Sequence, residues 1–218
     1  MTRHPVQRAV KRVLDPVAAA VGLVVLSPLY AAISVAVVVD SGRPVLFVSD
    51  RAGKDGRPFK MLKFRTMVPD AVRVGLEQGL TEDPFGLVKH DPRITRVGRW
   101  LRRTSLDELP QLVNVVAGRM SLVGPRADVV EQAARYAERE RRRLTVLPGI
   151  TGWAQVHGRD SISWPERFEL DLWYIDNWSL WLDAKIILRT LGEAFRPEPD
   201  PIEDTLNIER AKRRSSSP

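Results

Sequence analysis

Hydrophobic residues fill the early part of the chain in one long stretch, since residues 16–39 carry no charged side chain between Asp15 and Asp40. A straight helix over this stretch would be about 36 Å long, enough to cross a hydrocarbon core of about 30 Å. Ser27-Pro28 lies at its middle, where proline removes a backbone donor and clashes with the preceding turn. The pattern predicts either a kinked spanning helix or two half-helices that enter and leave by one face.

The flanking residues do not decide between these topologies. Basic residues occur on both sides, so the charges give no strong inside–outside bias. Lys11 and Arg12 belong to a basic N-terminal region such as a signal peptide has, but the apolar stretch is too long and lacks a cleavage site. The Ser27 hydroxyl can bond a carbonyl that Pro28 leaves free, which makes a kink tolerable in lipid.

The remaining pattern predicts a mixture of elements. Residues 44–48 and 58–65 indicate two short strands, and the glycines and aspartate of residues 51–57 indicate a hairpin turn between them. Residues 68–90 predict a variable loop or short helix, residues 128–143 a charged helix, and residues 166–195 a helix with apolar positions. The polar, proline-rich sequence after residue 195 predicts a disordered tail.

We therefore expect an α+β fold, mostly helical, with a short β-hairpin. Residues 1–42 form the basic N-terminus and membrane segment, residues 43–195 one folded domain, and residues 196–218 the tail. Five tryptophans gather in the last third of the chain, where interfacial and core positions explain them equally well. Arginines at every third position predict a basic helical face, which is either a binding surface or simply solvated; they are Arg93, Arg96, Arg99 and Arg102.

Composition narrows the chemistry. The formal net charge is +7, so the surface attracts anions, among them nucleic acid, anionic lipid and nucleotide phosphates. The absence of cysteine excludes disulfides, zinc–thiolate sites and a cysteine nucleophile. The three histidines show no metal-binding spacing, which argues against a histidine-rich metal site.

Asp107-Glu108 admits two interpretations. Ser105-x-x-Glu108 matches a capping box, and Asp107 is itself a candidate N-cap with Pro110 in the first turn of the following helix. Alternatively, the same helix N-terminus keeps Asp107 ionised, so that it can attack phosphorus and hold an acyl-phosphate. Glu108 is then placed to hold Mg²⁺.

Basic residues elsewhere fit the second interpretation. Lys63, Arg65, Arg102 and Arg126 can complete an anion clamp around a phosphate. Residues 118–126 supply a glycine-bounded loop that a phosphate can approach, although they do not form a Walker motif.

A series of motifs runs in order over roughly residues 8–190. They are Lys11-Arg-x-Leu-Asp15, Ser27-Pro28, Arg51-x-Gly53, Lys63-Phe-Arg-Thr-Met67, Asp91-x-Arg-Ile-Thr95, Gly98-Arg-x-Leu-Arg102, Ser105-Leu-Asp-Glu-Leu-Pro-Gln-Leu112, Met120-Ser-Leu-Val-Gly-Pro-Arg126, Pro148-Gly-Ile-Thr-Gly-Trp-Ala-Gln-Val156, Gly158-Arg159 and Asp171-x-x-Tyr174. With them the chain resembles the bacterial sugar transferases, the polyprenyl-phosphate phosphoglycosyl transferases of the monotopic type, in their minimal catalytic form.

The resemblance implies a re-entrant membrane helix broken at Ser27-Pro28 and a cytoplasmic catalytic domain on the bacterial inner membrane. It implies that Asp107 attacks the β-phosphate of a UDP-sugar, releases UMP, and passes the phosphosugar to a polyprenyl phosphate such as undecaprenyl phosphate. Mg²⁺ at Asp107 and Glu108 is the expected cofactor. The expected substrate-binding residues are Lys63, Arg65, Arg102, Arg126 and Arg159, and the expected membrane residues are Lys11, Arg12, Ser27 and Pro28.

One position departs from the family pattern. Ala127 follows Arg126 where the family usually has Pro-Arg-Pro, which puts the role of Arg126 in question. The expected partners are the UDP-sugar, the polyprenyl phosphate and inner-membrane lipids, and not nucleic acid. The sequence leaves open the sugar, for which residues 68–90 are the expected determinant, the glycan pathway, and a homodimer. The alternative is a membrane-anchored basic scaffold or nucleic-acid-binding protein, in which Asp107 is only a helix cap.

Overall fold

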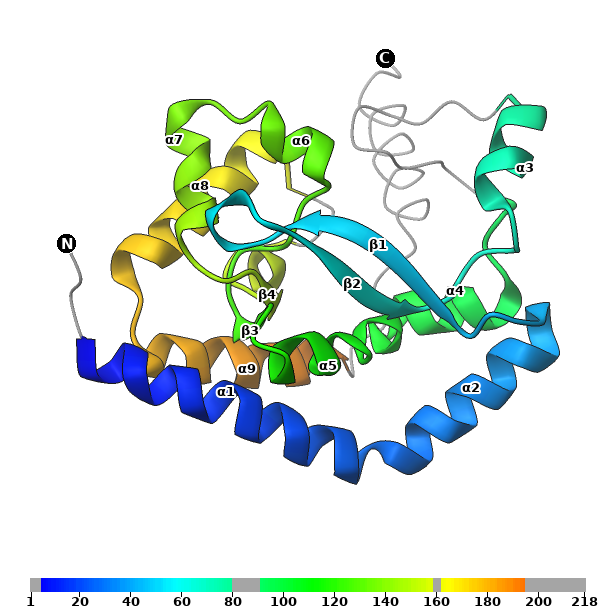
Figure 1. Ribbon diagram of the computed structural model, residues 1–218, viewed down its shortest axis with the longest axis horizontal. Helices are drawn as coiled ribbons and strands as arrows, with labels where there is room; N and C mark the ends of the chain where they lie inside the picture. Colours follow the sequence, from blue (N-terminus) through cyan, green and yellow to red (C-terminus); the bar gives the residue numbers. More distant parts are fainter. Residues whose placement is uncertain (1–4, 80–90, 159–161, 195–218) are drawn as a thin grey trace, which may run out of the picture.

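The computed structural model describes residues 5–79, 91–158 and 162–194 (Figure 1). These residues form mostly helices together with two small two-stranded sheets, which confirms the expected α+β class. The predicted tail, Arg159 and most of the segment expected to select the sugar lie outside the described residues.

Two apolar helices open the fold. Helix α1 (Pro5–Val25) and helix α2 (Ser27–Ser41) meet at Leu26 with a bend of 63°. The Ser27 hydroxyl donates to the Val24 carbonyl at 2.8 Å, and this is the carbonyl that the missing N–H of Pro28 leaves without its helical donor. In the described part of the chain no single helix is long and apolar enough to cross a membrane. The bent pair taken together has the length and composition that a membrane segment needs.

The predicted hairpin forms. Strand β1 (Leu46–Ala52) pairs antiparallel with strand β2 (Pro58–Phe64), with Leu46 opposite Phe64 and the 3₁₀ turn η1 (Lys54–Gly56) between them. Strand β1 extends to Ala52, beyond the strand expected to end at residue 48, because its pairing with β2 continues through the charged pair Asp50 and Lys60. The buried face of β2 packs on α5 (Gln111–Val116) and α1.

A second sheet was not expected from the sequence. Strands β3 (Ser121–Val123) and β4 (Gly149–Thr151) are three residues each and pair in parallel. The two segments approach so closely that a Cβ on Gly149 would lie 2.1 Å from the Gly124 nitrogen. The Gly149 N–H donates to the Pro125 carbonyl at 2.9 Å, so this crossing fixes the chain immediately before Arg126.

Two predicted helices are broken. Residues 128–143 contain α6 (Val130–Ala134), α7 (Glu138–Arg141) and the start of η3 (Arg142–Thr145). After α6 ends, Tyr136 is buried and Ala137 is extended, so α7 begins as a separate helix. The helix predicted over residues 166–195 is divided into α8 (Trp164–Asn177), which begins two residues earlier than expected, and α9 (Leu180–Ala194). Extended Trp178 and Ser179, whose hydroxyl accepts from the Leu182 N–H, separate them.

The helix that carries the basic residues is shorter than the run of arginines in the sequence. Helix α4 spans Arg96–Arg103 and begins at the N-cap Thr95, whose hydroxyl accepts from the Gly98 N–H at 2.9 Å. Arg93 precedes it and is buried against Asp91, with 2.7 Å between Nη2 and Oδ2. The expectation of one basic face from Arg93 to Arg102 is therefore wrong. Helix α3 (Ala71–Glu77) is the short helix expected after residue 68.

The bent helix pair lies along one side of the folded domain, below α5 and α9 in Figure 1. Buried residues of α1, β2 and α5 share one core cluster, and buried residues of α2, β2 and α4 share another. Lys11 joins α1 to α9 through Asp183, with Nζ and Oδ2 2.6 Å apart. The apolar helices are thus packed onto the domain rather than connected to it by a free linker.

Candidate active site

The two adjacent carboxylates lie in a tight turn between two helices. Asp107 and Glu108 belong to the 3₁₀ turn η2 (Leu106–Glu108), which follows α4 and precedes α5. Ser105 before the turn has a left-handed backbone with φ of 55°, and its hydroxyl caps none of the described N–H groups of η2. Helix α5 begins after Pro110. The capping interpretation of Ser105 and Asp107 is therefore wrong, and the turn instead directs Asp107 inward, where it is buried.

Two cations meet the carboxylates. Lys63 Nζ, from strand β2, lies 2.8 Å from Glu108 Oε1 and 3.8 Å from Asp107 Oδ2. Arg126 Nη2, from the segment after β3, lies 2.9 Å from the same Glu108 oxygen. Glu108 is thus clamped between two cations, while Asp107 lies beside them with a weaker contact. Ala127 does not prevent Arg126 from reaching the site.

The protonation of the pair follows from burial and charge. Burial raises the pKa of Asp107, and the neighbouring Glu108 charge raises it further, while Lys63 is the largest opposing influence. Burial also opposes ionisation of Glu108, but Arg126 and Lys63 overcome it and lower the pKa of Glu108 to about 2. Ionisation of Asp107 was expected from a helix N-terminus. It depends instead on cations from β2 and from the segment after β3.

The other predicted substrate-binding residues are placed differently. The Arg102 Nε donates to the Thr66 hydroxyl at 2.9 Å, and the Arg102 charge lowers the pKa of Asp107. Arg65 is buried at the end of α2, where its Nη2 donates to the carbonyls of Ser41 and Gly42 at 2.8 and 2.6 Å. Lys63 and Arg126 thus contact the pair, and Arg102 acts on it through its charge. Arg65 contacts the end of α2 through Nη2, while its buried Nε and Nη1 have no hydrogen-bond partner among the described residues.

The four residues predicted to lie at the membrane have different surroundings. Arg12 is exposed on α1, whereas Lys11 is turned toward Asp15 and Asp183, 3.2 and 2.6 Å from their Oδ2 atoms. Lys11 therefore fastens α1 to the folded domain. Ser27 and Pro28 make the break between α1 and α2.

Several residues that position the site were not predicted from sequence. The buried Asn114 amide accepts from the Leu62 N–H at 3.0 Å and donates to the Lys60 carbonyl at 2.7 Å, which holds the strand of Lys63 against α5. The Tyr30 hydroxyl of α2 donates to the Leu109 carbonyl, next to the carboxylate pair. No sequence signal marks these contacts, because each joins elements that are far apart along the chain.

The carboxylate pair has the donor set for Mg²⁺ only in part. No group of three or more histidine, aspartate or glutamate side chains with metal-binding geometry occurs among the described residues. Mg²⁺ nevertheless needs only one or two carboxylates when water and substrate phosphates supply its other ligands. Asp107 and the second oxygen of Glu108 fit that role, since the Glu108 Oε1 is occupied by Lys63 and Arg126.

Comparison with known proteins identifies the family. The model of the family described as bacterial sugar transferase matches residues 6–197, which include the carboxylate turn and all three cations around it. The chain belongs to the bacterial sugar transferase family. The resemblance carried by the motifs is thereby confirmed at the level of the family.

Curated members of the family show what related chains are named for. The sugar transferase EpsL of Bacillus subtilis, whose name marks it as uncharacterized, is 43% identical over 86% of this chain and 88% of its own length. The UDP-galactose-lipid carrier transferase of Erwinia amylovora is 44% identical over 87% of this chain. The UDP-glucose:undecaprenyl-phosphate glucose-1-phosphate transferase of Escherichia coli is 43% identical over 87% of this chain. This chain spans 41% of the length of each of these last two proteins.

Proposed function

We propose that this sugar transferase moves a sugar-1-phosphate from a UDP-sugar to a polyprenyl phosphate and releases UMP, through a covalent phosphosugar on Asp107. The observation that carries the proposal is the buried Asp107, with Lys63 Nζ 3.8 Å from its carboxylate and both Lys63 and Arg126 on the adjacent Glu108. Relatives named for UDP-galactose, UDP-glucose and undecaprenyl phosphate support the substrate classes.

The chemistry follows from these positions. An Asp107 oxygen forms a bond to the β-phosphorus, and the bond from that phosphorus to the bridging oxygen breaks, so the bridging oxygen leaves with UMP and the electron pair. Lys63 and Arg126 neutralise the phosphoryl oxygens on which charge develops. Mg²⁺, when bound at Asp107 and Glu108, supplies further neutralisation of the phosphates.

The second half of the reaction regenerates the carboxylate. An oxygen of the polyprenyl phosphate attacks the phosphorus of the aspartyl phosphosugar, and the bond to the Asp107 oxygen breaks. The product is a sugar joined to the lipid through a diphosphate, which starts a lipid-linked glycan for exopolysaccharide, capsule or O-antigen. One buried carboxylate therefore serves a soluble substrate and a lipid in turn.

The lipid substrate requires the site to lie at a membrane. The bent pair α1–α2 supports a re-entrant segment, since the pair has the length and composition for one and is bent by 63°. We propose that it enters the inner membrane from the cytoplasmic face. Its outward side chains are exposed apolar groups that a bilayer would cover; they include Val13, Val17, Val21, Val24, Val35 and Val39.

The test is release of UMP by the purified chain from a panel of UDP-sugars with undecaprenyl phosphate, including UDP-glucose and UDP-galactose. Asp107→Asn is expected to abolish UMP release, whereas Asp50→Asn, at an exposed ion pair on β1, is expected to retain it. Incubation without lipid, followed by mass spectrometry, is expected to find a phosphosugar on Asp107. UMP release by Asp107→Asn at the wild-type rate would exclude the covalent step. A turnover that needs both substrates together would favour direct attack by the lipid.

A further inference from the structure

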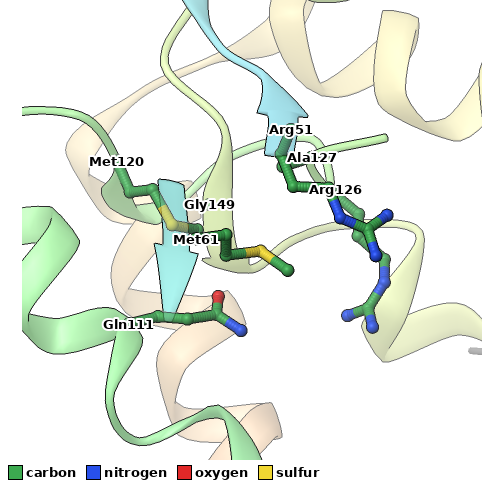
Figure 2. A pocket seen from close by; sticks show the side chains of 7 residues that line it. All are labelled: Arg51, Met61, Gln111, Met120, Arg126, Ala127 and Gly149. Carbon is green, nitrogen blue, oxygen red and sulfur yellow. The ribbon is translucent and has the colours of Figure 1, made fainter. Parts of the chain in front are cut away.

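A hollow beside the carboxylate turn is lined by Arg126 and by two polar side chains, Arg51 and Gln111, that the contacts described so far do not include. Arg51 at the end of β1, Gln111 at the start of α5 and Arg126 all contribute to its wall, together with Met61 and Met120. Figure 2 shows the two guanidinium groups side by side, with the Gln111 amide and the Met61 side chain directed toward the same space. Arg126 also contacts Glu108, so the hollow adjoins the proposed site of phosphoryl transfer.

Arg51 keeps hydrogen-bonding capacity in this hollow. Its Nε donates to the Ser49 hydroxyl at 3.3 Å, and among the described residues no hydrogen bond or ion pair engages its Nη1 or Nη2. The backbone holds it there, because Arg51 pairs with Val129 and the Ala52 N–H donates to the Asp128 carbonyl at 2.9 Å. Arg51 is thus fixed next to the segment that carries Arg126.

The charges of the hollow are not balanced by its own walls. Burial lowers the pKa of Arg51, and the Arg126 charge lowers it further. The carboxylates of Asp128, Glu108 and Glu131 oppose this. Asp128 already binds Arg143 and Tyr136, and Glu108 already binds Lys63 and Arg126. Two guanidinium groups that line the same hollow favour an anion between them.

Gln111 adds a hydrogen-bonding group to the wall of the hollow. The residue is 2% exposed, yet in residues 5–79, 91–158 and 162–194 its side-chain amide has no hydrogen-bond partner. Its amide atoms are not among the fully buried ones that lack a partner, so they are accessible from the hollow, into which they point. An oxygen-bearing ligand would satisfy this amide.

We infer that Arg51, Arg126 and Gln111 bind the phosphate that leaves with the nucleoside, one phosphate away from the group that Asp107 attacks. This inference rests on the proposed function and adds the leaving-group subsite to it. Arg51 would contact the α-phosphate of the UDP-sugar and remain in contact with UMP. Because that phosphate gains negative charge when the bridging oxygen departs, Arg51 would also stabilise the transition state of the first half-reaction.

The test measures UMP binding by calorimetry to the purified chain without lipid acceptor, so it does not depend on turnover. Arg51→Met is expected to weaken UMP binding by about tenfold to a hundredfold, the loss of a charge-assisted hydrogen bond. Gln111→Leu is expected to weaken it by about threefold to tenfold, as for a neutral hydrogen bond. Arg57→Met, which removes the same charge from the exposed hairpin turn, is expected to bind UMP as the wild type does.

The outcomes separate this inference from the proposed function. Asp107→Asn is expected to bind UMP normally while releasing none from a UDP-sugar. Unchanged UMP affinity in Arg51→Met would overturn the inference alone, and so would a raised KM for undecaprenyl phosphate with no effect on UMP.

If Arg51→Met does not fold, Arg51→Lys keeps one charge without the fork of two nitrogens. It is expected to bind UMP more weakly than the wild type, and wild-type affinity in Arg51→Lys would contradict the two-nitrogen contact.

Discussion

At the scale of single residues, Lys63 does most to set the charge of the proposed nucleophile. One ammonium group lies 2.8 Å from Glu108 Oε1 and 3.8 Å from Asp107 Oδ2, in a place where burial alone would favour the protonated acid. An aspartate attacks phosphorus only when it is ionised. The reactivity of Asp107 therefore depends on a side chain that lies 44 positions earlier in the sequence, on strand β2.

Substitution of Lys63 by methionine is expected to move the acidic limb of the rate–pH profile of UMP release to higher pH. Lys63 lowers the pKa of Asp107, so its removal raises that pKa and ionisation then needs a more alkaline solution. Lys60→Met removes an exposed ammonium from the same strand and is expected to leave the limb in place. A Lys63→Met profile that loses height without shifting would show that Lys63 binds substrate and does not tune Asp107.

At the scale of elements, the crossing of β3 and β4 determines where Arg126 lies. Gly149→Ala is expected to reduce UMP release strongly and to destabilise the fold by about 2 kcal/mol or more, because its Cβ would meet the backbone of Gly124 at 2.1 Å. Gly192→Ala on α9 has open space and is the matched control. Both variants are compared by UMP release and by chemical denaturation. Wild-type activity of Gly149→Ala would show that the crossing does not position Arg126.

The break between α1 and α2 predicts that both ends of the pair lie on one side of the membrane. The chain contains no cysteine, so single substitutions can be labelled without background. Val6→Cys and Arg43→Cys are expected to react with an impermeant maleimide in inverted inner-membrane vesicles and not in right-side-out vesicles. Val24→Cys, at the bend, is expected to react only after solubilisation. Labelling of positions 6 and 43 from opposite sides would mean a span.

Sequence patterns predicted the elements that depend on local signals. The hairpin follows from alternation and turn residues, and the break at Ser27-Pro28 follows from the missing proline donor. The same reasoning failed where tertiary contacts decide. Ser105 matches a capping box but adopts a left-handed turn, and no local pattern indicates that Arg65 contacts the end of α2. Strands β3 and β4 are too short to produce a pattern and exist because their glycines allow close approach.

At the scale of the whole molecule, one buried ionic cluster joins three distant segments. Arg143 of η3 binds the carboxylates of Asp128 and Asp171, and Tyr136 donates to Asp128. Arg143 Nη2 also donates to the Arg126 carbonyl at 3.2 Å, so the cluster supports the site from behind. Arg143→Met would leave two buried carboxylates without their cation. It is expected to lower the free energy of unfolding by about 3–5 kcal/mol in chemical denaturation.

The same cluster predicts how stability changes with pH. Burial raises the pKa of Asp171 from 3.8 to about 6, against the opposing charge of Arg143. The folded protein therefore holds this proton more tightly than the unfolded chain. The stabilisation is complete below about pH 4 and is lost as the pH rises through about 6.

Asp171→Asn is expected to flatten this part of the stability curve, since the amide does not titrate. The difference in slope between wild type and variant from pH 4 to pH 6.5 is the measurement, taken by denaturation at each pH, and Asp50→Asn serves as the exposed control. Parallel curves for wild type and Asp171→Asn would mean that Asp171 is already ionised at pH 4.

The hydrogen bond from Tyr30 to the Leu109 carbonyl ties the depth of α2 to the height of the carboxylate turn. If α2 enters lipid as proposed, a thicker or thinner bilayer would raise or lower Asp107 relative to the layer of acceptor phosphates. The catalytic rate would then depend on the acyl-chain length of the host membrane. It would be highest at the bilayer thickness that places Asp107 at the same depth as the lipid phosphate.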